Sequence, residues 1–312
     1  MSCTVDASVD LSVDIAGVKL KNPVMVASGT FGFGTEYAAY MDVSRLGAIV
    51  TKGLTLQPRT GNPPPRIWET PAGMLNSIGL QNPGIDAYLE HHLPALRAFK
   101  VPVIANVCGD TVKEYAEIAR RLECHEGADA IEVNISCPNV ERGGIAFGSD
   151  PRSAVAVVEA VKRATSLPVI VKLTPNVTDI AEIARACEGA GADALSLVNT
   201  LLGMAIDIYR MRPALGNVFG GLSGPAIRPV AVRMVWQVRE AVDLPLIGMG
   251  GIASFEDALE FILAGASAVA VGSGTFADPA CAIRVIDGIG QYMANNGFER
   301  VSHMVGLAHK CR

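Results

Sequence analysis

The sequence has few charged and few aromatic residues, and it contains no strongly basic segment. Charged residues make up 18% of the 312 positions, and the net charge is -5 at pH 7. Because there is no concentrated field of Lys and Arg, nucleic acid and anionic membranes are not the expected partners. Half of the residues are hydrophobic, so the chain can bury a large core. We expect small, mostly neutral binding partners.

Long hydrophobic runs and cysteine motifs are also missing. The longest apolar stretch, near 262–276, is too short and too rich in Gly and Ala to span a bilayer, and no basic-then-apolar leader begins the chain. The seven Cys residues are scattered and form no Cys-x-x-Cys pair, which indicates neither disulfides, zinc nor an iron–sulfur cluster. We therefore expect a cytoplasmic protein with one domain over residues 1–312 and no metal site.

Short apolar runs alternate with segments of helical periodicity. Helix starts are indicated at Thr111 with Glu114, at Asp150-Pro151 and at Ser254. Eight runs of this kind predict parallel strands, at 24–28, 48–51, 102–107, 130–135, 168–173, 194–198, 245–249 and 268–272. This alternation predicts an α/β protein, a (β/α)8 TIM barrel.

A doubly wound open sheet is the structural alternative. Its usual Gly-rich loop would follow the first strand, where this sequence has Ser28-Gly29-Thr30. The Gly-rich loop 248–251 instead follows the seventh strand, the customary phosphate position of a barrel. Residues 11–21 predict a hairpin that closes the other end of the barrel. The long connections 54–101 and 201–244 predict insertions over the catalytic face.

Polar and glycine residues gather at the predicted carboxyl ends of the strands, where barrels place their active sites. Lys52 and Lys172 directly follow apolar runs, so burial would require an anionic or electron-rich ligand, although either side chain could also extend into water. The turns at 250–251 and 272–274 could surround a phosphate with backbone N–H groups or could simply be tight turns. The ring as a whole is Ser28, Lys52, Gly53, Asn106, Asn134, Cys137, Lys172, Asn199, Thr200, Gly250, Gly251, Gly272 and Ser273.

Several Asn residues offer amide donors and acceptors to a ring with alternating N–H and C=O groups, such as a uracil or a flavin; they are Asn76, Asn106, Asn134, Asn139 and Asn199. Cys137 is the first catalytic candidate because it follows the buried strand 130–135 in a loop with Pro138. An isolated Cys is more often a small buried hydrophobe, so this assignment depends on its surroundings. The five His residues avoid all these positions, which gives no support for a metal site or a His-activated nucleophile.

Together these motifs resemble dihydroorotate dehydrogenases of class 1, and most closely the class 1B catalytic subunits. The resemblance spans nearly the whole chain. It is carried by residues 27–30, 51–53, 76–82, 134–139, 171–172, 199–200, 222–224 and 250–251.

The resemblance implies FMN-dependent oxidation of (S)-dihydroorotate to orotate in pyrimidine (UMP) biosynthesis. Cys137 would be the base that takes the C5 proton while hydride leaves C6 for the flavin N5. The implied substrate-binding residues are Lys52, Asn76, Ser77, Ile78, Gly79, Leu80, Asn134, Asn139, Asn199 and Thr200. The implied FMN-binding residues are Ser28, Lys52, Gly53, Asn106, Asn134, Lys172, Val198, Gly224, Gly250, Gly251, Gly272 and Ser273. The family often has Thr in place of Ser273, and the hydroxyl is kept.

The subclass determines the expected electron acceptor. Class 2 relatives use Ser as the base and carry an N-terminal membrane segment, whereas this chain has Cys137 and begins almost directly at the barrel. Class 1A enzymes also use Cys but pass electrons to fumarate, so the choice of class 1B depends on overall likeness. Class 1B implies a homodimer within a heterotetramer, whose partner subunit carries FAD and a 2Fe-2S cluster and reduces NAD.

Three other readings stay open. A dihydropyrimidine dehydrogenase-like flavin domain shares the Cys motif but acts on uracil or thymine. A flavin-free phosphosugar barrel of the aldolase type could use Lys172 in a Schiff base. The third is a non-catalytic barrel that serves only as a binding subunit.

Overall fold

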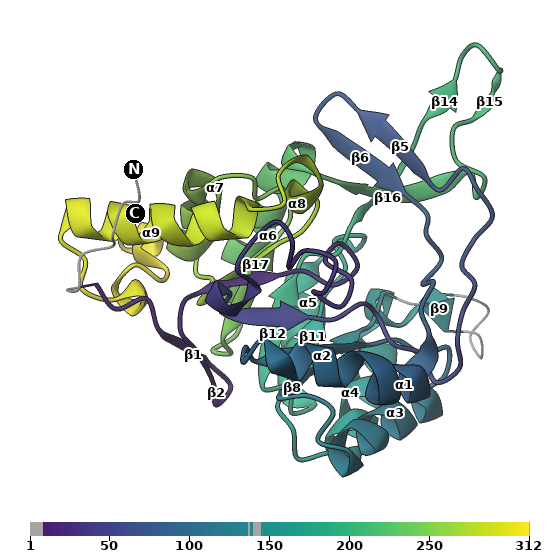
Figure 1. Ribbon diagram of the computed structural model, residues 1–312, viewed down its shortest axis with the longest axis horizontal. Coiled ribbons are helices and arrows are strands. Elements are labelled where there is room, and N and C mark those ends of the chain that lie inside the picture. Colours follow the sequence, from purple (N-terminus) through teal and green to yellow (C-terminus); the bar gives the residue numbers. More distant parts are fainter. Residues whose placement is uncertain (1–8, 137, 140–144, 312) are drawn as a thin grey trace.

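The computed structural model describes residues 9–136, 138–139 and 145–311. At its centre is a closed barrel of parallel strands, each paired with the next barrel strand along the chain (Figure 1). These strands are β3 (Val24–Val26), β4 (Ala48–Val50), β7 (Val103–Val107), β8 (Ala130–Asn134), β11 (Val169–Lys172), β12 (Ala194–Leu197), β17 (Leu246–Met249) and β18 (Ala268–Val271). They coincide with the eight predicted runs, so the prediction of a (β/α)8 barrel is confirmed.

Helices follow the strands and cover the outside of the barrel. They are α1 (Gly84–Ala87), α2 (Leu93–Ala98), α3 (Val112–Cys124), α4 (Pro151–Ala164), α5 (Ile180–Gly189), α6 (Arg228–Arg239), α7 (Phe255–Leu263), α8 (Gly274–Ala277) and α9 (Cys281–Asn296). A π-helical turn at Tyr88–His92 joins α1 to α2, and 3₁₀ turns cover Val43–Arg45, Phe147–Ser149, Pro225–Ile227, Val301–His303 and Leu307–Cys311. Within the described residues, none of these helices is both long and apolar enough to cross a membrane.

The predicted helix starts are confirmed by their caps. Thr111 accepts a hydrogen bond from the Glu114 N–H at the start of α3, and Asp150 accepts one from Ser153 at the start of α4. Ser254 and Asp257 form a reciprocal capping box before α7. Each cap satisfies N–H groups that the first helical turn leaves without an intrahelical acceptor.

The interior of the barrel is built in layers, because alternate residues of each strand face inward and alternate strands contribute to each layer. The lowest layer holds four alanines, Ala48, Ala130, Ala194 and Ala268, and the next holds Met25, Ile104, Ile170 and Ile247. The third layer holds Val50, Glu132, Ser196 and Ala270. Apolar side chains therefore fill the lower interior, and polar side chains first enter at the third layer.

The N-terminal end of the barrel is closed by the hairpin of β1 (Val13–Ile15) and β2 (Val18–Leu20). Ile15, Val18 and Leu20 are buried against the same apolar cluster as the two lowest layers. The prediction that residues 11–21 form a closing hairpin is confirmed.

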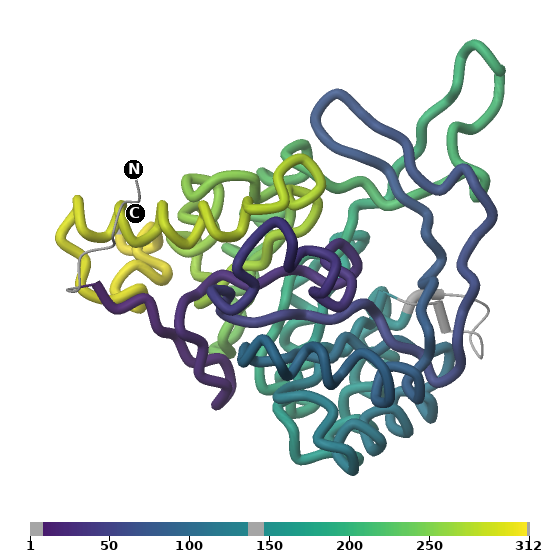
Figure 2. The backbone as a smooth tube through the Cα atoms, in the orientation of Figure 1, coloured from purple at the N-terminus to yellow at the C-terminus, as the bar shows by residue number. Residues whose placement is uncertain are grey.

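The two long connections each contain an insertion, and the insertions pair with each other. β5 (Ile67–Thr70) and β6 (Gly73–Asn76) come from the first, and β13 (Leu201–Met204) and β16 (Phe219–Ser223) come from the second. They form one antiparallel sheet in the order β13-β16-β6-β5. The hairpin of β14 (Ile206–Asp207) and β15 (Arg212–Pro213) projects farthest from the barrel, and the tube in Figure 2 shows both insertions leaving on the same side. The backbone pair of β9 (Pro138–Asn139) and β10 (Ile145–Ala146) follows β8.

Candidate active site

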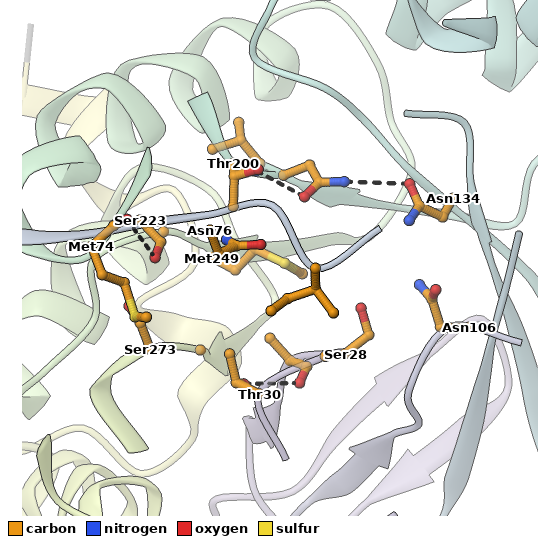
Figure 3. Close-up of a pocket in the computed structure, with 18 of the residues that line it drawn as sticks. Ser28, Thr30, Met74, Asn76, Asn106, Asn134, Thr200, Ser223, Met249 and Ser273 are labelled. Carbon is orange, nitrogen blue, oxygen red and sulfur yellow. Dashed lines mark hydrogen bonds between the residues drawn. The ribbon is translucent and has the colours of Figure 1, made fainter. Parts of the chain in front are cut away.

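A cavity of about 390 Å³ lies at the carboxyl ends of the barrel strands, beneath the sheet that the insertions form. This size suits a small-molecule or cofactor site. Its wall contains most of the residues chosen from the sequence: Ser28, Lys52, Gly53, Asn76, Ser77, Ile78, Gly79, Leu80, Asn106, Asn134, Lys172, Val198, Asn199, Thr200, Gly250, Gly251, Gly272 and Ser273. In Figure 3 the labelled side chains of this set approach one space from different strands and loops.

The layered interior explains why these particular residues meet. Above the layer that contains Glu132, the next layer is Ala27, Asn106, Lys172 and Met249, and the one above it is Lys52, Asn134, Val198 and Gly272. All eight residues line the cavity. The same period-two alternation that places apolar groups in the lower layers therefore places two lysines and two asparagines in the upper ones.

Lys172 is held at the floor of the cavity by two oxygen atoms. Its Nζ donates to the Ser28 hydroxyl at 3.2 Å and lies 3.5 Å from Oε2 of Glu132. Lys172 is 4% exposed and Glu132 is 1% exposed. A buried ammonium with a carboxylate on one side and an open cavity on the other can attract electron density from a bound ring.

Lys52 follows β4 and also lines the cavity. It forms no ion pair within the part of the chain that the structure describes. Burial lowers the pKa of Lys52 below its ordinary value of 10.5; the neighbouring Cys108 thiol opposes this change, and the Arg66 guanidinium adds to it. A desolvated ammonium of this kind favours an anionic ligand, because the ligand would restore the missing counter-charge.

The asparagine amides form an open chain along one wall. Asn199 Nδ2 donates to Asn134 Oδ1 at 3.3 Å, and Asn199 Oδ1 accepts from the Thr200 N–H at 2.8 Å. Asn134 Nδ2 donates to Cys108 Sγ at 3.5 Å, and Asn76 Nδ2 donates to the Gly221 carbonyl at 3.3 Å. Two of the three contacts to oxygen are long, at 3.3 Å. An amide has two donors and an oxygen with two lone pairs, so Asn76, Asn134 and Asn199, which all line the cavity, keep capacity for a ligand.

One buried hydroxyl in the wall has no hydrogen-bond partner among the residues that the structure describes. It belongs to Ser77, which lines the cavity. A buried polar group without a partner costs stability, and a ligand with a carboxylate or carbonyl oxygen would remove that cost. This hydroxyl can therefore form a hydrogen bond with a polar ligand in the cavity.

The glycine corner of the cavity keeps the backbone exposed. Gly250 and Gly251 have φ values of 125° and 84°, which L side chains rarely adopt. At Gly272, a Cβ would meet only Ala27, at 3.8 Å, so this side of the corner is open. The corner can therefore approach a phosphate closely with its N–H groups.

Some predicted residues lie elsewhere or outside the described residues. Gly224 is not part of the cavity wall, but its neighbour Ser223 is, and the Gly224 backbone packs against Gly73 instead. Cys137 lies outside the described residues, as does the side chain of Asn139, whose backbone belongs to β9.

Sequence reasoning missed some of the apolar residues in the wall. Ile67, Met74 and Phe276 also line the cavity, and Ile67 and Phe276 are 51% and 54% exposed. Ile67 and Met74 come from the inserted sheet, and Phe276 from α8. Their signal in the sequence is weak, because single apolar residues in a long connection are usually assigned to local packing.

The fold and the cavity together define a (β/α)8 barrel whose C-terminal face holds a cavity lined by polar side chains and a glycine corner. The family model for dihydroorotate dehydrogenase matches residues 10–293. The chain is 60% identical over 297 residues to the dihydroorotate dehydrogenase B (NAD(+)) catalytic subunit of Geobacter sp. (strain M21), covering 95% of this chain and 97% of that protein. It is 60% identical over 302 residues to the protein of the same name from Desulforudis audaxviator, covering 97% of this chain and 98% of the relative. The chain belongs to the dihydroorotate dehydrogenase family.

Proposed function

We propose that this chain is the catalytic subunit of an NAD-linked dihydroorotate dehydrogenase, which oxidises (S)-dihydroorotate to orotate in pyrimidine biosynthesis. The observation that carries this proposal is one cavity that brings Lys52, Lys172, the asparagine amides and the glycine corner together. Family membership supports the same reaction, and the names of the relatives support an NAD-linked partner subunit.

The residues present fit FMN. The glycine corner at Gly250, Gly251, Gly272 and Ser273 suits the phosphate, and Asn106 and Lys172 on the cavity floor suit the polar edge of the ring. When bound, FMN supplies the acceptor for the hydride that leaves C6 of the substrate. Lys172 stabilises the negative charge that develops beside it, because its ammonium is buried and already held in place by Ser28 and Glu132.

The substrate is held by the opposite wall in this proposal. Lys52 and the segment from Asn76 to Leu80 receive the carboxylate, and the unpartnered Ser77 hydroxyl gains its missing hydrogen bond. Asn134, Asn139, Asn199 and Thr200 hold the pyrimidine ring by its N–H and C=O groups. Cys137 removes the C5 proton, which places the base in the loop after β8.

Electron transfer onward requires a second protein. We propose that the chain forms a homodimer inside a heterotetramer with a subunit that carries FAD and a 2Fe-2S cluster and reduces NAD. Within the described residues no cluster of His, Cys, Asp and Glu could hold a metal ion. We place this complex in the cytoplasm and assign residues 1–312 to one domain.

Anaerobic mixing of the FMN-loaded protein with dihydroorotate tests the reaction directly. Flavin absorbance should bleach, and it should recover on addition of NAD only when the partner subunit is present. A purified protein that neither contains nor takes up yellow flavin would contradict the proposal and favour a flavin-free barrel. Recovery with fumarate alone would instead indicate class 1A.

Two further measurements test the substrate and the base. Orotate should bind far more tightly than uracil, because uracil lacks the carboxylate that Lys52 and Ser77 receive. Equal affinities would indicate a dihydropyrimidine dehydrogenase-like site.

The flavin of the C137S variant should bleach much more slowly at neutral pH, because a serine hydroxyl is a weaker base than a thiolate. An unchanged rate would remove Cys137 from the mechanism.

A further inference from the structure

A carboxylate lies inside the barrel directly below the floor of the cavity. Glu132, in the middle of β8, is 1% exposed and does not line the cavity. Val50, Ser196 and Ala270 share its layer, and the two layers beneath it contain apolar side chains. The charge is therefore removed from water on every side except the one that faces the cavity floor.

Three polar groups contact this carboxylate. Asn106 Nδ2 donates to Oε2 at 2.5 Å, and the Ser196 hydroxyl donates to Oε1 at 2.8 Å. Lys172 Nζ lies 3.5 Å from Oε2 and also donates to Ser28. Glu132 therefore connects its own strand to β7, β11 and β12, and two of its three partners are cavity residues.

The fold alone does not explain an acid at this position. Burying a carboxylate is costly, and well-packed apolar residues often replace a buried ion pair without loss of stability. The alternation of β8 requires only an inward side chain between Ala130 and Asn134. The Glu132 carboxylate, in contrast, contacts polar groups in its own layer and in the layer above. Ser196 lies in its own layer, and Asn106 and Lys172 lie in the layer above.

We propose that Glu132 is a positioning residue that holds Asn106 and Lys172 at the cavity floor and offsets part of the Lys172 charge, so that it sets the reduction potential of the bound flavin. This inference rests on the proposed function, because it assigns a flavin to the cavity. Reduction places negative charge on the flavin, and the ammonium of Lys172 favours it. The carboxylate of Glu132 opposes that effect, so its charge lowers the potential.

The midpoint potential of the FMN-loaded protein tests this assignment by equilibration with a reference dye. The E132Q variant keeps the shape of the side chain and removes its charge, so its flavin should be easier to reduce. We expect a tenfold shift of the reduction equilibrium, which is about 30 mV upward for a two-electron couple. A potential equal to that of the unmodified protein, or lower, would overturn the proposal.

A double-mutant cycle tests whether Glu132 acts through Lys172. K172M should lower the potential, and adding E132Q to K172M should then change it by less than half of the shift seen with E132Q alone. An undiminished shift would mean that Glu132 does not act through Lys172. The control S196A removes the contact of Glu132 with its own layer, and it should shift the reduction equilibrium by less than about 1.5-fold, which is about 5 mV.

E132D provides the measurement if E132Q does not fold. It keeps the charge and moves it one methylene away from Lys172, so the potential should rise by a smaller amount, and no rise would count against the proposal. Failure of the proposed function looks different, because the unmodified protein would then not bind FMN or not bleach with dihydroorotate. If the unmodified protein does both and the variants keep its potential, only the role of Glu132 is wrong.

Discussion

The two ends of the barrel are built by the same strands, yet one end is closed and the other is hollow. At the N-terminal end the hairpin of β1 and β2 presses Ile15, Val18 and Leu20 onto a layer of alanines. At the C-terminal end two lysines and two asparagines stand among the interior residues, and an inserted sheet covers a cavity of about 390 Å³. The closed end therefore contributes stability through apolar burial, whereas the open end keeps polar groups that a ligand can bind.

The largest expected effect comes from Lys172 at the open end. K172M should reduce the turnover of dihydroorotate by about 10²–10³-fold, because a preorganised charge beside the reacting groups is lost. Stopped-flow bleaching of the flavin measures this rate. The matched control is K19M, which removes an exposed lysine from the closing hairpin and should leave the rate unchanged. Equal losses of rate in K172M and K19M would contradict the assignment of catalysis to the open end of the barrel.

At the closed end, L20A should act on stability and not on catalysis. Leu20 is 1% exposed, and its truncation leaves a cavity under the barrel, so the free energy of unfolding should fall by about 3 kcal/mol. Denaturant titration measures this change, and the affinity for FMN should stay as it was. L202A is the control, because Leu202 is 65% exposed and its loss should change stability by less than about 0.5 kcal/mol.

The pH dependence of orotate binding should reveal Lys52. Burial lowers the pKa of Lys52, so the ammonium loses its proton below the ordinary lysine range, and orotate affinity should then fall about tenfold per pH unit. Titration of flavin absorbance at several pH values measures it, and K52M should bind weakly with a flat profile. Since the unfolded chain keeps this proton to higher pH, the contribution of Lys52 makes unfolding less favourable as pH rises between the lowered and the ordinary pKa. A profile identical in K52M would contradict the assignment.

The smallest expected effect concerns the unpartnered hydroxyl of Ser77. S77A removes no hydrogen bond to any residue that the structure describes, so stability should change by less than about 0.5 kcal/mol. Orotate affinity should drop about fivefold, which corresponds to one hydrogen bond of about 1 kcal/mol. Thr70 also has a buried, unpartnered hydroxyl but does not line the cavity, so T70V should leave orotate affinity unchanged. If T70V lost as much orotate affinity as S77A, the loss in S77A could not be attributed to contact between Ser77 and orotate.

Much of the site could be predicted because it depends on strand ends. Each barrel strand carries a short apolar run, and closure of the barrel brings the residue after each run to one face. Lys52, Asn134 and Lys172 were found in this way, and all three line the cavity. Glu132 needs a different rule, because it lies in the middle of β8, where alternation points it inward between Ala130 and Asn134. The role of Glu132 was not predicted, because a single acidic residue within an apolar run does not indicate which residues it contacts.

The eight strands, the helix caps at Thr111, Asp150 and Ser254, and the closing hairpin follow from the sequence, because periodicity and capping depend on neighbours along the chain. The folded structure was needed to show that the two insertions pair as β16 with β6, which brings Asn76 beside Gly221. It also decided that Glu132 meets Lys172 and Asn106, three residues from three different strands. Contacts of this kind depend on strand register and barrel closure. Both involve segments that are far apart in the chain, so they leave no local pattern in the sequence.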